Sequence, residues 1–278
     1  MQHVPIAFID SLFQTFPKSP IHLKRLARLS RPFDKCIKSF LQKVHQKYYT
    51  LLDGELVETS YVDCNNNTID WNHYCLDYRW MTCLEFEATS EDIPKIDKTL
   101  MTKISKERGR LWLSLRSPNL DKHWINEFAS WKNLTLLSIS ARHDLNIIYL
   151  LEKILETKQL ITLHFEFASD VECHFALEFL KQPQFSTVRF GKSGREIVGN
   201  LWNLWRTDHK ILSGKSVAWY RRKKLHDSSF ERIGQVENDV LRYRSGSRLV
   251  EYVNGKGLPG MRKADFIRGI RSSHVHFL

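Results

Sequence analysis

Two short segments of this 278-residue chain contain residue types that bind phosphate or metal ions in other proteins. Gly214-Lys215-Ser216 ends like a phosphate-binding loop, in which backbone amides and a lysine surround a phosphate group. The glycine that opens such a loop is replaced by His209, so we interpret this segment as an ordinary loop. His274 and His276 could hold a metal ion only with ligands from elsewhere, and we expect this pair to be solvent-exposed.

A cysteine and a histidine, which together form the nucleophile and base of many hydrolases, are adjacent at Cys173-His174. Side chains of neighbouring residues on a helix point about 100° apart, so these two groups cannot act on each other. The five cysteines include no C-x-x-C pair, which argues against a disulfide framework or a zinc finger. We therefore expect no catalytic residues, no metal site, no cofactor and no enzymatic activity.

The start of the chain and its hydropathy bear on cellular location. Residues 1–5 lack the charged region and following apolar run of a secretory signal. No stretch reaches the ~18 apolar residues that a membrane helix needs. We expect an intracellular protein, cytoplasmic or nuclear, that does not bind membranes.

The net charge of +11 is concentrated at the two ends of the chain. Residues 1–48 carry nine Lys and Arg against two Asp and Glu, and residues 215–278 carry fourteen against six. Together with the basic run Arg221-Arg222-Lys223-Lys224, this distribution would suit a nucleic-acid-associated protein that uses its basic ends. The simpler interpretation is that these side chains lie on ordinary solvated surfaces.

An apolar pattern recurs along the middle of the chain. In each copy an apolar residue is followed three and then five positions later by two more, and the central positions stand 24 to 29 residues apart. Such a period is typical of leucine-rich-repeat solenoids, because one strand and one helix cannot bury their apolar faces alone. The copies are Met81/Leu84/Phe86, Arg110/Leu113/Leu115 (which lacks the first apolar residue), Leu134/Leu137/Ile139, Leu160/Leu163/Phe165 and Phe185/Val188/Phe190.

Helix signals separate the strands of these copies. Leu145 to Leu155 has apolar residues at helical spacing, and we expect Ile148, Leu151 and Leu155 to be buried. Ser169 with Glu172 fits a capping box. Sequential strands joined by helices should pair in parallel through right-handed crossovers. We therefore predict an α/β fold, an irregular leucine-rich-repeat-like solenoid of strand-helix units with a parallel sheet. A doubly wound α/β domain is the competing fold, although no Gly-rich loop follows any of these strands.

The segments on either side of the repeats indicate separate modules. Three short amphipathic helices are expected before residue 48, and an Asp53-Gly54 pair between two β-prone runs indicates a hairpin. We predict five regions: a small helical module 1–48, a hairpin and capping segment 49–80, βα repeats 81–207, capping strands 208–254 and a basic, flexible tail 255–278.

A solenoid leaves one face of its strands uncovered by helices, and this concave face is the candidate binding surface. Charges of both signs beside an aromatic residue suit a protein partner there better than a polyanion. The alternative is an ordinary solvated sheet face without a ligand. Residues that alternate with the buried strand positions should lie on this face: Glu85, Glu87, Trp112, Arg116, Ser138, His164, Glu166 and Arg189.

The N-terminal segment resembles a divergent F-box, the three-helix module that docks on the Skp-type adaptor of cullin-RING ubiquitin ligases. The whole chain is similar to a nematode-expanded set of F-box-like proteins with irregular repeats, through residues 4–11, 150–155, 177–185 and 234–240. The residues that carry the F-box resemblance are Val4-Pro5, Phe8-Ile9-Asp10-Ser11-Leu12, Leu23, Leu26 and Leu29-Ser30-Arg31-Pro32-Phe33.

This resemblance implies a function in protein recognition. The concave face would choose a substrate, and a Skp-type adaptor would dock on Pro5, Ile6, Ile9, Leu12, Leu26 and Phe33. Without the family, the same residues are simply a helical core. We expect a non-enzymatic adaptor that serves as the substrate-recognition subunit of a ubiquitin ligase. The alternatives are a nucleic-acid-associated protein and a repeat scaffold without a ligase.

Overall fold

A computed structural model divides the chain into an N-terminal unit, Met1–Leu113, and a C-terminal unit, Ser114–Leu278. Both units contain helices and strands, so the fold is mixed α/β with extensive sheet. The structure describes residues 31–65, 67–70, 79–89, 97–107, 109–117, 120–141, 144–191, 197–223, 225–237, 240–254 and 263–278.

The sheet of the N-terminal unit is built on the predicted hairpin. β1 (His45–Leu52) pairs antiparallel with β2 (Glu55–Asp63) and parallel with β3 (Arg79–Glu87). The turn between β1 and β2 is Asp53-Gly54, whose φ angles of 50° and 84° are those a two-residue hairpin loop requires. The hairpin prediction is therefore confirmed. The other elements are α3 (Arg31–Lys43), α4 (Lys98–Ser105) and β4 (Arg110–Leu115), which contains the boundary between the units.

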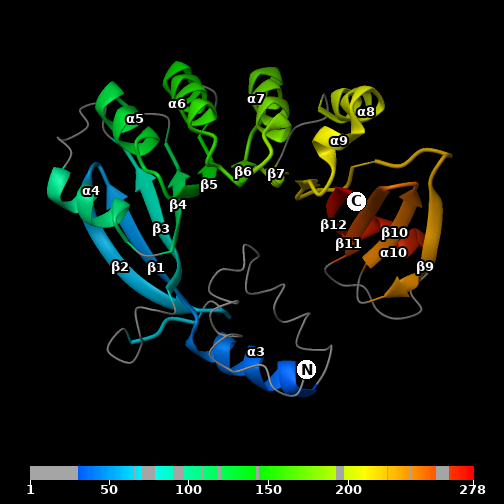
Figure 1. The fold of residues 1–278 in the computed structure, drawn as a ribbon, viewed down its shortest axis with the longest axis horizontal. Helices are drawn as coiled ribbons and strands as arrows, with labels where there is room; N and C mark the ends of the chain where they lie inside the picture. The colour runs from blue at the N-terminus through cyan, green and yellow to red at the C-terminus, as the bar shows by residue number, and fades with distance from the viewer. Residues whose placement is uncertain are drawn as a thin grey trace. The chain divides into compact units, whose positions relative to one another are not determined.

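In the C-terminal unit, strands β5 to β8 pair in parallel, with helices between them. Figure 1 shows α5, α6 and α7 side by side along one face of these strands. The elements are α5 (Lys122–Ala129), β5 (Leu134–Ile139), α6 (Leu145–Thr157), β6 (Thr162–Phe165), α7 (Asp170–Lys181), β7 (Thr187–Phe190), α8 (Ile197–Thr207), α9 (His209–Leu212) and β8 (Ser216–Trp219).

The apolar positions of the repeat pattern form the core beneath these helices. Leu137, Leu163 and Val188 are register partners on neighbouring strands, and all three are fully buried. A second layer includes Phe190, whose ring stacks 6.1 Å from Phe165 and 5.9 Å from Trp219. Full burial of side chains of this size stabilises the fold by about 1.5–3 kcal/mol each. The predicted burial of the repeat positions is confirmed.

The end of the chain extends this sheet with antiparallel strands. The sheet continues from β8 in the order β12-β11-β10-β9. β12 is thus paired on both sides, and Ser273, Val275 and Phe277 are buried in it. The elements are β9 (Glu231–Glu237), β10 (Val240–Ser245), β11 (Arg248–Asn254), α10 (Lys263–Arg268) and β12 (Ile270–Phe277).

The prediction of a flexible tail is therefore wrong for residues 270–277. This strand has only two clearly apolar residues in its second half, Val275 and Phe277, so it has no strong local strand signal. It is held by hydrogen bonds to β8 and β11, which lie well before it in the chain. Pairing with distant segments cannot be seen in a local apolar pattern.

Two segments with suggestive residue types have structural roles. Lys215 is buried and donates hydrogen bonds to the carbonyl oxygens of Leu180 and Gln182, where α7 ends, so it satisfies acceptors that the helix leaves unpaired. On α7 itself, Cys173 is buried and His174 is exposed, as the divergence of neighbouring side chains requires. The capping box of Ser169 and Glu172 is also confirmed.

Candidate functional site

One face of the C-terminal sheet carries a line of side chains that are polar at every position except Ala218 on β8. Because side chains alternate along a strand, residues between the buried positions lie on the opposite face of the sheet. Register partners on β5, β6, β7, β8, β12, β11 and β10 form this line, which we call the polar row: Ser138, His164, Arg189, Ala218, His274, Glu251 and Arg242, in that order.

His164 links the first part of the polar row to the end of β8. Its Nδ1 lies 3.1 Å from the hydroxyl of Ser138, and its ring meets that of Tyr220 edge to face at 5.2 Å. Burial lowers the pKa of His164; the charge of Glu166 opposes this shift and that of Arg189 adds to it. The imidazole is therefore neutral at neutral pH. Its Nε2 is buried without a hydrogen-bond partner among the described residues, which costs about 1–3 kcal/mol.

Arg189 lies at the centre of the polar row and is exposed. Its guanidinium makes no hydrogen bond or ion pair with any residue that the structure describes. Tyr220, which follows β8 and is 47% exposed, is the other large exposed side chain here. An unpaired arginine and an exposed tyrosine are the residue types that dominate binding energy in protein interfaces.

Gly191, directly after β7, has room for no side chain. A Cβ there would lie 2.5 Å from the carboxylate Oε2 of Glu166 and 2.6 Å from the Glu166 backbone oxygen. The glycine thus lets the Glu166 side chain lie across the end of β7. This close approach brings a carboxylate to the same end of the strands as Tyr220.

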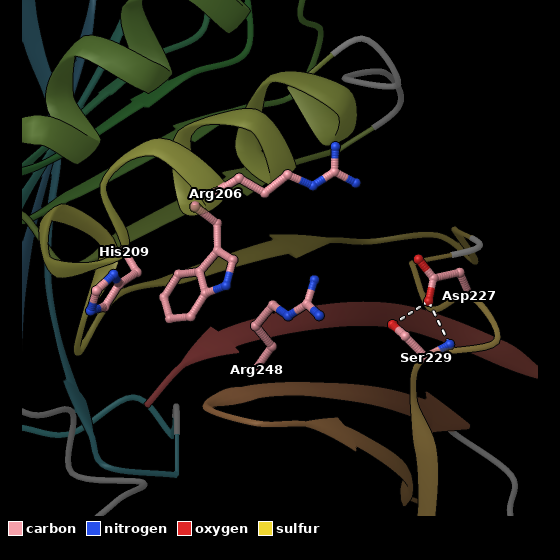
Figure 2. A pocket seen from close by; sticks show the side chains of 6 residues that line it. Arg206, His209, Asp227, Ser229 and Arg248 are labelled. Atoms are coloured by element: carbon pink, nitrogen blue, oxygen red, sulfur yellow. Dashed lines mark hydrogen bonds between the residues drawn. The ribbon is translucent and has the colours of Figure 1, made fainter.

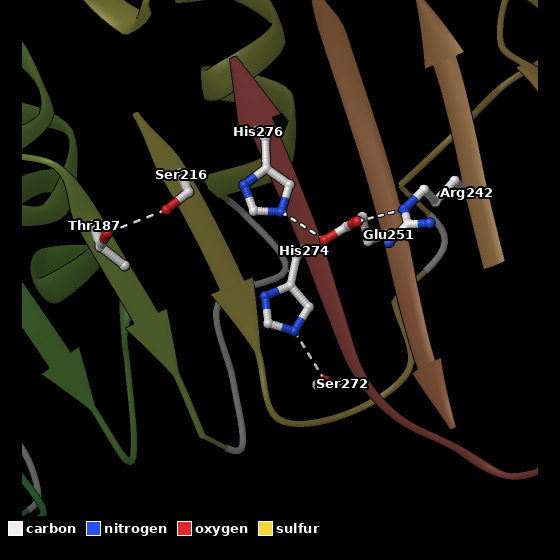
Figure 3. A network of polar contacts seen from close by, with 7 residues as sticks. All are labelled: Thr187, Ser216, Arg242, Glu251, Ser272, His274 and His276. Carbon is white, nitrogen blue, oxygen red and sulfur yellow. Dashed lines mark hydrogen bonds and ion pairs between the residues drawn. The ribbon is translucent and has the colours of Figure 1, made fainter. Parts of the chain in front are cut away.

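The second part of the polar row is an internally paired network (Figure 3). Glu251 accepts a 2.7 Å hydrogen bond from Nε of Arg242, and its other oxygen lies 3.0 Å from Nε2 of His276. The rings of His274 and His276 are parallel, with centroids 6.1 Å apart. Ser272 contacts Nε2 of His274 at 2.9 Å. The expectation that the histidine pair is solvent-exposed is wrong, because both residues are half-buried on this central strand.

These contacts fix the charges of the network. Hydrogen bonding from His276, supported by Arg242, lowers the pKa of Glu251 to about 2 against the opposing effect of burial. Burial, with the nearby His276, lowers the pKa of His274 to about 4. Glu251 is therefore a carboxylate and His274 a neutral ring over the physiological range. The network is a rigid polar surface whose charges are largely satisfied.

The predicted concave-face residues are only partly brought together. Ser138, His164 and Arg189 are adjacent members of the polar row, and Glu166 is one residue beyond β6. Arg116, directly after β4, is exposed.

Glu85, Glu87 and Trp112 belong to the N-terminal unit, where the Trp112 ring lies 6.4 Å from that of Tyr48. Glu85 and Glu87 alternate with buried residues of β3, as predicted.

The predicted adaptor-docking residues are not placed. Pro5, Ile6, Ile9, Leu12 and Leu26 lie outside the described residues, and Phe33 is described only as a backbone position of α3.

Several residues of this face were missed by the sequence analysis. Tyr220, Arg242, Glu251, His274 and His276 come from strands or strand ends beyond the repeats. The alternation of Ser272, His274 and His276 with buried residues was the available signal, but it becomes informative only once β12 is placed inside the sheet.

A second cluster of charges lies buried in the N-terminal unit. Glu107 accepts hydrogen bonds from Lys47 at 2.8 Å and from Tyr49 at 2.6 Å, and it forms an ion pair with Arg79. The bond from Lys47 lowers the pKa of Glu107 despite the opposing burial, and burial raises the pKa of Tyr49 to about 12. Lys47 also lies 5.5 Å from the ring centre of Tyr61. Glu107 thus pairs with residues of β1 and β3, and the cluster joins these strands to the end of α4.

No group of three or more His, Cys, Asp or Glu side chains that could hold a metal ion is found in the described ranges. Within the same part of the chain, every helix is too short or too polar to cross a membrane. Comparison of the chain with protein-family models, with curated proteins and with solved structures finds no match. The interpretation of the site therefore depends on its geometry.

Proposed function

We propose that this chain is a non-enzymatic adaptor that binds a protein partner on the face that bears the polar row. The proposal rests on one observation, the state of Arg189. This residue is an exposed cation without a partner among the described residues, whereas the other central charges of the surface are paired. A fixed surface around one free guanidinium loses little entropy when it binds. A carboxylate of the partner would pair with Arg189 through two parallel hydrogen bonds.

We interpret the strand-helix units from β5 to β8 as leucine-rich-repeat-like. Support comes from their parallel register, the one-sided helices and the burial of matching apolar positions. The sheet then continues in antiparallel strands, which would make the repeat array short and extend its open face to Arg242. In such an array the uncovered strand face is the usual binding surface.

The proposal is tested by reversing the charge of Arg189 and measuring whether bound proteins are lost. The full-length chain is expressed with an affinity tag as wild type, as Arg189→Glu and as Lys122→Glu, the last an exposed lysine of α5 on the helix layer. Proteins that co-purify with the wild type should be reduced at least about 10-fold with Arg189→Glu and unchanged with Lys122→Glu. Equal recovery by all three chains would contradict binding through this face.

The ligase part of the proposal follows from the F-box resemblance alone. Full-length Ile9→Asp should lose capture of a Skp-type adaptor while keeping the partners that depend on Arg189, because a charge would disrupt the apolar docking face. If the wild-type chain, folded and monodisperse, captures no such adaptor, the protein is a recognition scaffold without a ligase.

Nucleic-acid binding is the second candidate function. It is favoured by Arg221 and Arg222, which are exposed directly after Tyr220, since arginines beside an aromatic ring suit phosphate contacts with base stacking. Retention on DNA should then fall with salt, and the slope should decrease when Arg221, Arg222, Lys223 and Lys224 are replaced by glutamine. Salt-independent or absent retention would exclude it.

A further inference from the structure

The C-terminal unit also contains a cavity of about 550 Å³ on the other side of its sheet. Arg248, which lines the cavity, is two residues from buried Val250 and therefore shares its face, whereas Glu251 of the polar row lies on the opposite face. The cavity is thus separate from the proposed protein-binding face. Its lining residues are Trp205, Arg206, His209, Asp227, Ser229 and Arg248.

Arg248 is held in place before any ligand arrives. Its guanidinium lies 5.3 Å from the ring centre of Trp202 and 4.8 Å from that of Phe230, and it donates a 2.9 Å hydrogen bond to Ser245. Figure 2 shows Arg206 extending from α8 on the other side of the cavity from Arg248. Arg206 is exposed and makes no ion pair with a described residue.

The wall between these arginines and α9 is aromatic. The ring of Trp205 stacks on Phe277 at 5.3 Å and meets His209 edge to face at 5.7 Å, so its position is also fixed. An apolar wall beside convergent polar groups is the usual composition of a small-molecule site, and the volume lies within the range of such sites.

One acidic residue faces the arginines. Asp227 accepts hydrogen bonds from the backbone N–H of Ser229 at 2.8 Å and from its hydroxyl at 2.5 Å. These bonds, with the charge of Arg248, lower the pKa of Asp227, so it remains a carboxylate. The cavity therefore carries two arginine charges against one carboxylate.

We infer that this cavity binds a small molecule that carries a phosphate monoester. Two guanidinium forks on opposite sides of one space offer more donors than a single carboxylate can accept, whereas a phosphate has three terminal oxygens and up to two charges. The Trp205 wall would contact the group that bears the phosphate. The carboxylate of Asp227 weakens the site and sets a limit on its affinity.

Titration calorimetry of the full-length protein with adenosine monophosphate, inorganic phosphate and adenosine tests this inference. We expect binding of the first two with a Kd of about 1 mM or tighter, and none of adenosine. Arg206→Gln should weaken phosphate binding about 10-fold, because it removes an attractive charge. Asp227→Asn should strengthen phosphate binding, because it removes a repulsive charge. Arg221→Gln, which removes an exposed arginine outside the cavity, should leave it unchanged.

Absence of binding of both phosphate compounds to the folded wild type would overturn the inference. An equal loss of phosphate affinity in Arg206→Gln and Arg221→Gln would also overturn the inference, because the loss would then follow from the net charge of the protein and not from the cavity. Arg206 and Asp227 are surface residues, so thermal melts that coincide with the wild type would verify that both variants are folded.

Discussion

The charges of the polar row depend on neighbours that come from different strands. Glu251 on β11 receives its partners from β10 and β12, and His274 on β12 has Ser272 and His276 beside it on the same face. Each pKa shift is thus a property of the assembled sheet. Stability against pH therefore reports whether these strands are assembled as described.

Glu251→Gln should lower the free energy of unfolding at pH 7 by about 2 kcal/mol, because the charged hydrogen bonds to Arg242 and His276 are lost. The folded pKa of about 2 lies below the ordinary 4.5, so the unfolded chain binds the proton first as the pH falls. The wild type should therefore lose this stabilisation between about pH 4.5 and 2, and the variant should not. Urea unfolding across that pH range measures this loss of stabilisation, and Glu231→Gln, at an exposed residue, is the control.

His274→Gln should make the free energy of unfolding less dependent on pH between about pH 4 and 6.5. Its folded pKa of about 4 lies below the ordinary 6.5, so protonation favours the unfolded chain and stability falls as the pH drops from 6.5 to 4. The wild type should lose about 2 kcal/mol more than the variant over this interval. Urea midpoints at several pH values test this, with exposed His174→Gln as the matched substitution. Parallel profiles would mean that His274 is not buried among these neighbours.

At the scale of elements, the sequence predicted what is encoded locally. The Asp53-Gly54 turn, the Ser169 capping box and the apolar residues of the repeat strands each depend on a few neighbouring residues, and all are present. Even there, details differ: α6 buries Ile147, Leu150, Leu151 and Ile154, whereas Ile148, part of the expected apolar face, is half-buried.

What could not be predicted depends on pairing between distant segments. β12 has two apolar side chains in its second half and owes its place to β8 and β11. Because β12 supplies His274 and joins β8 to β11, two of the seven members of the polar row, His274 and Glu251, could not be placed in the row from the sequence. Three predicted site residues, Ser138, His164 and Arg189, were found because they alternate with strong apolar positions on locally encoded strands.

Removal of residues 270–278 should prevent the C-terminal unit from folding, because β12 bridges β8 and β11 and buries Val275 and Phe277. Removal of Leu278 alone, which is 54% exposed, should leave the thermal transition in place. Circular dichroism melts of both truncated chains show whether residues 270–277 form a central strand or a flexible tail. An unchanged cooperative transition after the longer truncation would contradict the described sheet order.

Gly191→Ala should destabilise the C-terminal unit by about 1–3 kcal/mol, because the new Cβ would overlap both the side chain and the backbone oxygen of Glu166. The matched change Gly199→Ala on α8 meets no atom within 4 Å and should stabilise the helix by up to about 1 kcal/mol. Denaturant unfolding of both variants gives the comparison. Equal stability of the two would show that Glu166 does not lie across the end of β7.

At the scale of the whole molecule, the two proposed binding sites of the C-terminal unit lie on different surfaces. The polar row and Tyr220 face one side of the C-terminal sheet, and the cavity between Arg206 and Arg248 opens on the other side. A protein partner and a small phosphorylated ligand could therefore bind at the same time without sharing residues. The adaptor-docking segment would add a third task at the N-terminal end of the chain.

Site-specific photo-crosslinking tests the central proposal most directly. A benzophenone side chain is placed at Tyr220 beside the polar row or, as the matched control, at Tyr149 on α6, which is 39% exposed on the helix layer. The full-length chain is then irradiated in cells. We expect a discrete crosslinked protein from position 220 that is absent from position 149 and lost when Arg189→Glu is added. The same products from both positions, or no dependence on Arg189, would contradict recognition through this face.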